Sequence, residues 1–234
     1  MRRRGIRFKA VTVRAVPRAT ELAHRRQAEH HERLHREVTG LLAAGYECVF
    51  ADEACFTWRG WQRREWSHRR TNIELPQLQP LRGQCWACCG AVSRESGKLV
   101  FMFRERAFKG PDIVAFFREL AARMDGRTWF LLLDNATVHQ TRALREEAER
   151  AGVPLVFNVP YSPWFNSIEL HWAQAKHVFR RLGTRSLLRG QRRNLLQEAT
   201  DAVWAPPDAG IARQWEQSLR LIRSIGTPHP LYPQ

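Results

Sequence analysis

Residues 129–135 read Trp-Phe-Leu-Leu-Leu-Asp-Asn, and this stretch decides the fold class. Its apolar residues do not alternate with polar ones, which predicts a central strand covered on both faces, as parallel strands are. Asp134 then stands at the end of that strand, where open α/β sheets place their ligands. An ionised carboxylate there is costly unless it is hydrogen bonded, paired or metal-bound. The alternative is an ordinary turn or helix N-cap residue, because Asp-Asn also favours turns.

A second carboxylate lies in the stretch 46–56, the first strand that the sequence predicts. Side chains alternate along a strand, so Asp52 faces one side of the sheet and Glu53 faces the other. The two acids therefore do not both enter one site if the strand is regular. An ordinary exposed strand position is the alternative for Asp52.

A third carboxylate, Glu169, follows a Tyr-Ser-Pro loop at 161–163, and 34 residues separate it from Asp134. The apolar positions of the helix predicted here leave Glu169, Lys176 and Arg180 at the margin of the buried stripe or beyond it. Side chains at this margin can contact bound metal ions and a row of phosphate groups at the same time. The alternative is structural, because Asn166 as N-cap and Glu169 as the third helical residue would also form a capping box.

The remaining pattern predicts a hairpin between the first strand and the Trp129 strand, and a further strand before the Glu169 helix. Three strands, helix, strand, helix, strand, helix is the order of a ribonuclease H-like α/β fold. Its mixed sheet has three antiparallel strands followed by two parallel ones, and helices flank it. The strands are predicted at 46–56, 84–93, 98–108, 129–133 and 154–159, and the helices at 112–124, with Asp112 as N-cap, 141–151 and 166–182.

The sequence divides into three predicted parts. Residues 1–40 are a basic linker arm and an amphipathic helix, 19–40, that ends at Gly40. Residues 41–184 are the ribonuclease H-like domain, interrupted by a polar insertion at 57–83. Residues 185–234 form a helical extension whose helices, 186–204 and 208–224, are separated by two prolines.

The charge of the chain indicates a polyanionic partner. Its 38 Lys and Arg outnumber 23 Asp and Glu, giving a net charge of +15, and nucleic acid is the leading candidate. In the insertion, Arg59, Arg63 and Arg64 alternate with tryptophans at 58, 61 and 66. Aromatic and arginine side chains in this pattern suit stacking on bases and clamping of phosphates. Packing of the tryptophans on the core is the equal alternative.

The five cysteines are interpreted as reduced thiols. The number is odd, and no signal-peptide core follows Met1, which favours a cytoplasmic protein. Cys85 and Cys88 have the spacing of half a zinc site, but no second ligand pair follows at finger-like distance, so buried strand cysteines are preferred. No stretch reaches the ~18 apolar residues of a membrane span, and no membrane partner is expected.

Three carboxylates in one site are typical of enzymes that cleave phosphodiester bonds with metal ions. Two Mg²⁺ ions ~4 Å apart can ionise the attacking water, neutralise the scissile phosphate and support the leaving oxygen. Mg²⁺ prefers hard oxygen ligands, and Mn²⁺ can replace it. Asp52, Asp134 and Glu169 are therefore predicted as the catalytic metal ligands. His139 is interpreted as a residue that orients a ligand, with a simple helix-start position as the alternative.

At these residues the chain resembles a known family. The segments 51–53, 134–136 with His139, and 160–163 continuing through Asn166 to Glu169 are similar to the catalytic signatures of mariner-like DDE transposases. The bacterial insertion-sequence branch is the nearest likeness, and the gap between the last two acids matches its pattern. The similarity covers roughly residues 40–205 and identifies the chain as a catalytic domain.

The resemblance implies a mechanism and partners. Asp52, Asp134 and Glu169 would bind the metal ions, while the enzyme cuts at transposon ends and joins the freed 3′ hydroxyl to target DNA, commonly at TA. The active complex would be a homodimer, and the protein would sit in the bacterial cytoplasm, on the nucleoid when bound to DNA. Supporting roles at the site fall to Glu53, Asn135, His139 and Asn166, and DNA contacts to Arg59, Arg63, Arg64, Lys176 and Arg180.

Two departures from the family keep other interpretations open. Trp164, Phe165 and Ser167 replace the usual Asp-Leu and Pro of the loop, which changes a turn but spares the ligand. The chain also starts in what resembles the linker after the family's helix-turn-helix domains, so either these domains come from a separate or frameshifted upstream reading frame or the gene is a decayed fragment. The alternatives are an inactive DNA-binding remnant and another ribonuclease H-like nuclease, such as a resolvase or RNA–DNA hybrid nuclease.

Overall fold

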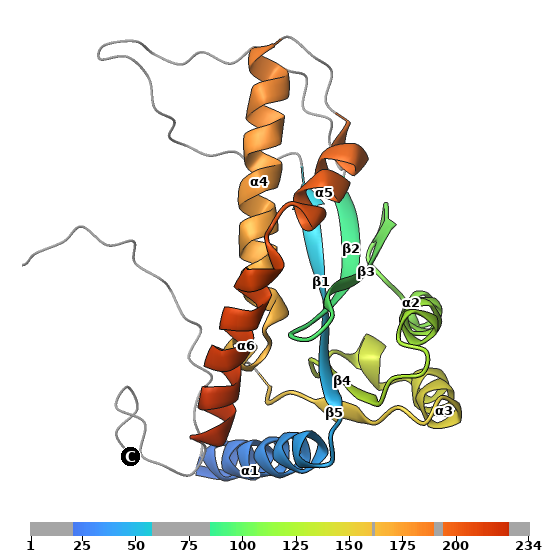
Figure 1. Cartoon of the computed structure of the whole chain (residues 1–234), viewed down its shortest axis with the longest axis vertical. Coiled ribbons are helices and arrows are strands. Elements are labelled where there is room, and N and C mark those ends of the chain that lie inside the picture. The colour runs from blue at the N-terminus through green and yellow to red at the C-terminus, as the bar shows by residue number, and fades with distance from the viewer. Residues whose placement is uncertain (1–20, 58–84, 161, 190–193, 225–234) are drawn as a thin grey trace, which may run out of the picture.

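A five-stranded mixed sheet forms the centre of the protein (Figure 1). The structure is a computed structural model that describes residues 21–57, 85–160, 162–189 and 194–224. The strand order is β3-β2-β1-β4-β5, with antiparallel pairing from β3 to β1 and parallel pairing from β1 to β5. The predicted α/β class and mixed sheet are confirmed. The strands are β1 Glu47–Thr57, β2 Cys85–Ser93, β3 Gly97–Arg104, β4 Trp129–Leu133 and β5 Leu155–Phe157.

Helices cover both faces of the sheet. Figure 1 shows α4 and α6 on one side and α2 and α3 on the other, with α1 across the lower end. Each face buries its own hydrophobic cluster. The helices are α1 Glu21–Ala43, α2 Gly110–Arg123, α3 Arg142–Arg150, α4 Ile168–Leu188, α5 Leu195–Trp204 and α6 Asp208–Arg223, with short 3-10 helices η2 Thr137–Gln140 and η3 Pro163–Phe165.

Strand β1 separates the two clusters by simple alternation. Cys48 and Phe50 lie in the cluster with α1, α4, α5 and α6, whereas Val49 and Ala51 lie in the cluster with α2 and α3. β4 contributes to both clusters because both of its faces are buried. This is the arrangement that the unbroken apolar run of β4 predicts.

Several predicted helix ends are wrong. The helix predicted over 166–182 is α4, which continues to Leu188, and the helix predicted over 186–204 is α5, which begins only at Leu195. Helix α1 continues through Gly40 to Ala43, and the turn after it is made by Gly45, whose φ is 83°. Gly40 costs the helix some stability but has the allowed helical backbone, so it does not end it. The N-cap of α2 is Lys109, and Asp112 is the third helical residue, whose carboxylate accepts the Lys109 N–H at 2.9 Å.

The predicted domain boundaries cross continuous structure. Helix α4 runs through residues 184 and 185, and the cluster on its side of the sheet includes side chains from α1, α5 and α6. The division into three parts stays a prediction. The predicted insertion, 57–83, falls almost wholly outside the described residues.

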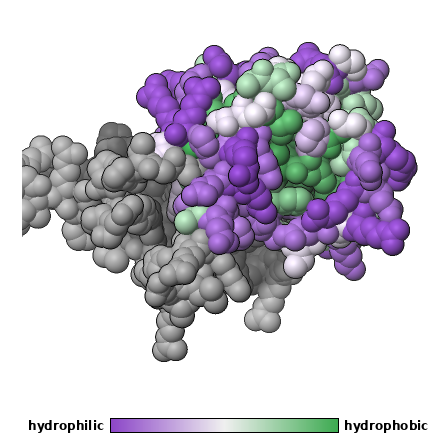
Figure 2. Space-filling view, turned by 90° about the horizontal axis from the view of Figure 1, so that it is seen from below, coloured by the Kyte–Doolittle hydropathy of each residue, from purple (hydrophilic) through white to green (hydrophobic). Residues whose placement is uncertain are grey.

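The lower end of the molecule, where α1 and α3 lie, is mainly hydrophilic with a hydrophobic area set among polar side chains (Figure 2). None of the helices in the described part of the chain is both long and apolar enough to cross a membrane.

Candidate active site beside β1 and the end of β4

The register of β1 and β4 brings Asp52 and Asp134 together. The two strands pair in parallel with Phe50 opposite Leu132. Two residues further along the chain are Asp52, within β1, and Asp134, one residue past the end of β4, so the register of the strands brings the two acids towards one another. Within β1, Asp52 shares the parity of Phe50, whose side chain lies in the cluster on the α4 side. The charge of Asp134 is one of the causes that raise the pKa of Asp52, so these two predicted ligands lie near each other.

Asn166 fixes the start of α4 against β1. Its buried side chain donates from Nδ2 to the carbonyl oxygen of Ala51 at 3.5 Å, and its Oδ1 accepts the Ile168 N–H at 3.3 Å. Glu169 therefore lies in the first turn of a helix that is tied to the residue before Asp52. The Asn166 N–H donates to Pro163 O at 2.9 Å, so it does not complete a capping box with the Glu169 carboxylate.

The pKa values report how closely these acids are crowded. Burial, with Glu169 as the next cause and Glu53 and Asp134 adding to it, raises the pKa of Asp52 to about 7. Burial also raises the pKa of Glu169, which Asp134 reinforces and Lys176 opposes. Negative charge accumulates here because carboxylates from β1, the end of β4 and α4 share one partly desolvated region.

His139 joins two acids that belong to different strands. Its Nδ1 lies 2.6 Å from Asp134 Oδ1, and its Nε2 lies 2.9 Å from Glu53 Oε1. Burial disfavours the charged ring, but the two carboxylates outweigh burial and raise the pKa of His139 to about 10. The imidazolium therefore donates to both acids at neutral pH. Asp134 responds in the opposite direction, since the His139 bond lowers its pKa despite burial.

The bridge leaves part of Asp134 open. The His139 side chain is 1% exposed, whereas that of Asp134 is 49% exposed. The same oxygen, Asp134 Oδ1, accepts the hydrogen bonds from His139 and from the Ala136 N–H, the latter at 2.9 Å. Within the described residues, Oδ2 has no hydrogen bond and can accept a cation.

Glu53 points away from Asp52, as strand alternation predicts. Its carboxylate meets His139 of η2 on the α2 side of the sheet. Glu53 therefore acts through His139 and not as part of the Asp52 side of the site. The sequence predicted a supporting role for both residues without showing that they contact each other.

Asn135 and Asn158 hold the loop after β4 to the end of β5. The Asn135 amide donates to the Asn158 carbonyl oxygen, and the buried Asn158 amide donates to Ser162 O at 2.9 Å. This connection positions the residues that follow Asp134 and those that lead to Glu169. Asn158 was missed from the sequence. Its position at the end of a Val-Phe run, just before Val-Pro, was the available signal.

Gly90 was also missed, and it sets how closely α4 approaches the sheet. It pairs with Asp52 across β1 and β2. A Cβ at this position would lie 2.6 Å from ring atoms of Phe101 and Trp172. Trp172 belongs to α4, one turn beyond Glu169, so the missing side chain lets this helix lie close beside the strand that carries Asp52.

The part of the chain that contains these residues also matches a known protein family. A family model described as DDE superfamily endonuclease matches residues 47–188, more than half of the chain. The chain belongs to this family. The matched region contains all three carboxylates and His139. The family prediction is confirmed, and the bacterial branch stays a prediction.

Solved structures of a mariner transposase share the fold of this DDE endonuclease. The Mos1 strand transfer complex superposes with a TM-score of 0.64 at 17% identity, over 96% of this chain and 66% of that one. The Mos1 catalytic domain gives 0.58 at 14%, over 89% and 94%. The Mos1 paired-end complex with Mn gives 0.63 at 16%, over 94% and 66%. The ribonuclease H-like fold is thereby confirmed.

The chain spans slightly less than two thirds of the longer Mos1 chain in the strand transfer complex. None of the curated proteins matches the sequence.

The donor set of this DDE endonuclease suits a hard divalent cation. Asp52, Asp134 and Glu169 offer carboxylate oxygens, the ligands that Mg²⁺ and Mn²⁺ prefer. A cation would also offset the crowding that raises the pKa of Asp52. In the ranges that the structure describes, no three His, Cys, Asp or Glu side chains are already grouped as a metal-binding cluster.

The predicted DNA-contacting residues are placed only in part. Lys176 and Arg180 lie on α4, and both are partly exposed. Lys176 is close enough to Glu169 to oppose the rise in its pKa. Arg59, Arg63 and Arg64 lie outside the described residues.

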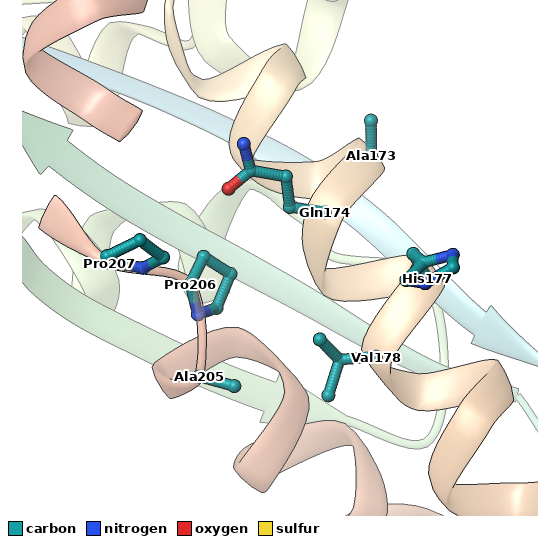
Figure 3. A pocket seen from close by; sticks show the side chains of 7 residues that line it. All are labelled: Ala173, Gln174, His177, Val178, Ala205, Pro206 and Pro207. Atoms are coloured by element: carbon teal, nitrogen blue, oxygen red, sulfur yellow. The ribbon is translucent and has the colours of Figure 1, made fainter. Parts of the chain in front are cut away.

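A surface pocket of about 380 Å³ lies apart from the acids (Figure 3). Figure 3 shows it between α4 and the turn that joins α5 to α6. Its walls are mostly apolar and include none of the three carboxylates. The lining residues are Ala173, Gln174, His177, Val178, Ala205, Pro206 and Pro207.

Proposed function

We propose that this chain is the catalytic domain of a transposase, which cleaves DNA at transposon ends and transfers the strands into target DNA. The observation that carries the proposal is the crowding of Asp52, because burial and the charges of Glu169 and Asp134 raise its pKa to about 7. Membership of the DDE superfamily endonuclease family and the fold shared with Mos1 transposase support it.

The cofactor of this proposal is a pair of divalent cations, Mg²⁺ or Mn²⁺, held by Asp52, Asp134 and Glu169. Mos1 complexes with Mg and with Mn support this choice. When bound, such a pair activates the attacking oxygen and neutralises the charge that develops on the scissile phosphate. The carboxylates supply the negative charge that holds the cations in place.

The surrounding residues orient the ligands. His139, held by Glu53, fixes Asp134 so that Oδ1 is occupied and Oδ2 stays available. Asn166 holds the helix of Glu169 against the backbone beside Asp52. Loss of a hydrogen bond that orients a metal ligand typically lowers metal affinity or activity about 10–100-fold.

DNA is the proposed partner, as transposon ends and as target. Lys176 and Arg180 extend along α4 from Glu169 and would contact the phosphate backbone beside the acids. Arg59, Arg63 and Arg64 of the insertion and a homodimeric active complex complete the proposal. It implies a bacterial cytoplasmic setting, with the protein on the nucleoid when bound to DNA.

Nicking of supercoiled DNA tests the proposal. We expect nicking that requires Mg²⁺ or Mn²⁺ and that falls at least about a hundredfold in Asp134→Asn, because that change removes a charged ligand. Asp125→Asn is the matched control, since Asp125 is an exposed acid in the turn after α2. Metal-dependent nicking that persists unchanged in Asp134→Asn would contradict the proposed site.

Two further measurements separate the alternative functions. Calorimetry with Mn²⁺ should show binding that is lost in Asp52→Asn, Asp134→Asn and Glu169→Gln, whereas an inactive remnant would bind DNA without this dependence. Strand transfer of a 3′-hydroxyl end into a plasmid distinguishes a transposase from other nucleases of the fold. A branched junction or an RNA–DNA hybrid, cleaved in preference to that reaction, would indicate a resolvase or a hybrid nuclease.

A further inference from the structure

Two cysteines meet at the end of the β1–β2 pair. Cys55 lies near the end of β1 and Cys85 begins β2. In the antiparallel register Cys55 pairs with Ala87 and Thr57 pairs with Cys85, so the cysteines are diagonal neighbours on one face. Their sulfur atoms are 3.2 Å apart. Cys55 is exposed and Cys85 is partly exposed.

The other cysteines are in a different environment. Cys48, Cys88 and Cys89 are buried, and burial raises the pKa of each thiol. The prediction of buried strand cysteines is thus correct for Cys88 and wrong for Cys85. The zinc-like spacing of these two has no chelating geometry, because residues three apart on a strand face opposite sides.

We propose that Cys55 and Cys85 form a thiol–disulfide modification site that is oxidised by a low-molecular-weight disulfide such as oxidised glutathione. The Cys55 thiolate attacks one sulfur of the small disulfide, and the other sulfur leaves and takes up a proton. The Cys85 thiolate then attacks the Cys55 sulfur and releases the second small thiol, which is also protonated. The protein loses two hydrogens, and one small disulfide becomes two thiols.

Exposure and geometry assign the order of these steps. Cys55 is accessible to a dissolved disulfide, whereas burial and the contact with Cys55 raise the pKa of Cys85 to about 11. Cys85 therefore reacts once the mixed disulfide has been placed beside it. The sulfurs must approach by about 1 Å to reach bonding distance, and a change of this size is small at the ends of two strands.

The bond would join the two strand ends from which residues 58–84 depart. Between the two cysteines lie 29 residues, so the crosslink removes conformational freedom mainly from the unfolded chain. It would also fix the end of the strand that carries Asp52 and Glu53. This site is independent of DNA cleavage, and its test does not depend on the proposed function.

Peptide mapping by mass spectrometry tests the site directly. The reduced full-length protein is incubated with oxidised glutathione, alkylated and digested. We expect a peptide pair linked through Cys55 and Cys85, absent from Cys55→Ser and reversed by dithiothreitol. Cys85→Ser should stop at a glutathione adduct on Cys55. Cys88→Ala is the matched control and should retain the link.

Thermal unfolding gives a second readout. Oxidation should raise Tm of the wild type by roughly 5–10 °C, the effect of closing a loop of this size in a domain of this length. Cys55→Ser should show no such rise. The proposal is overturned if the wild type yields only glutathione adducts, if the link joins other cysteines, or if oxidation leaves Tm of the crosslinked protein unchanged or lower.

Discussion

At the scale of single residues, the site combines a destabilised acid with a stabilised histidine. Asp52 is held among carboxylates that raise its pKa to about 7, whereas His139 is held between carboxylates that raise its own to about 10. The first arrangement costs folding free energy and favours binding of a cation. The second contributes folding free energy and orients Asp134.

Asp52→Asn should stabilise the metal-free protein while abolishing cleavage. The folded-state pKa lies above the ordinary value of 3.8, so the folded protein binds this proton more tightly and loses stability as pH rises from about 4 to 7. Removing the acid should therefore raise the free energy of unfolding by on the order of 2 kcal/mol at pH 8.

Urea denaturation in EDTA at pH 4.5 and pH 8 measures this gain, which should be larger at pH 8. Asp125→Asn, an exposed acid in the turn after α2, serves as the control and should show little change at either pH. An equal gain at both pH values would contradict the crowding of Asp52.

His139→Gln should destabilise the protein in a pH-dependent way. A histidine whose folded pKa is raised contributes stability that is complete below about 6.5 and is lost as pH rises through about 10. The variant leaves the carboxylates of Glu53 and Asp134 without the imidazolium that both of them contact. We expect a loss of about 2–4 kcal/mol at pH 6.

The difference in free energy of unfolding between the wild type and His139→Gln should shrink between pH 6 and pH 10. His30→Gln, a partly exposed histidine of α1, provides the comparison. A difference that stays constant over this range would show that His139 is not held as the imidazolium.

At the scale of elements, local pattern fixes the type of most helices and strands, and packing fixes where they end. The unbroken apolar run of β4 correctly predicted burial on both of its faces, and the alternation of β1 correctly predicted which of its side chains share a face. The end of α1 was missed because Gly40 tolerates helical geometry. The helix ends only at Ala43, just before Gly45 adopts a positive φ. Asn166 was predicted as a cap, but its bond to Ala51 spans 115 positions and is not readable locally.

Two glycines should respond in opposite ways to alanine. At Gly90 the new methyl group would collide with Phe101 and Trp172, so Gly90→Ala should destabilise by about 1–3 kcal/mol and displace α4 from β2. At Gly40, inside α1, nothing would lie within 4 Å of an added Cβ, and Gly40→Ala should stabilise by about 0.5–1 kcal/mol.

Chemical denaturation of both glycine variants checks the signs. DNA nicking by Gly90→Ala should also fall, since Glu169 lies one turn before Trp172 on α4. Gly90→Ala with wild-type stability would contradict the close approach of α4 to the sheet.

At the scale of the whole molecule, the helices before and after the matched family region belong to the same core. Trp215 of α6 packs edge-on against Phe50 of β1, with ring centroids 5.3 Å apart. Leu34 of α1 and Ala202 of α5 are fully buried in the same cluster. The strand that carries Asp52 is therefore covered on one face by parts of the chain far from it in sequence.

Removal of residues 195–234 should abolish cooperative folding. The truncation deletes α5 and α6 and exposes the apolar face that they cover, which a domain of marginal stability does not tolerate. Near-ultraviolet circular dichroism and urea denaturation would show the loss. Deleting only residues 225–234 is the control, because every described contact stays in place. A cooperative transition in the longer truncation would favour a separate C-terminal extension.

By itself, the sequence determined the alternation of β1, the buried β4, the three acids and the family signature, because these depend on residue order over a few positions. The tertiary structure decided that Glu53 contacts His139 across 86 positions and that the Asn158 carbonyl oxygen accepts a hydrogen bond from the Asn135 amide. It also decided that Cys55 lies beside Cys85. Such contacts depend on strand register and helix packing. These are set by the burial of the whole core and have no local pattern in the chain.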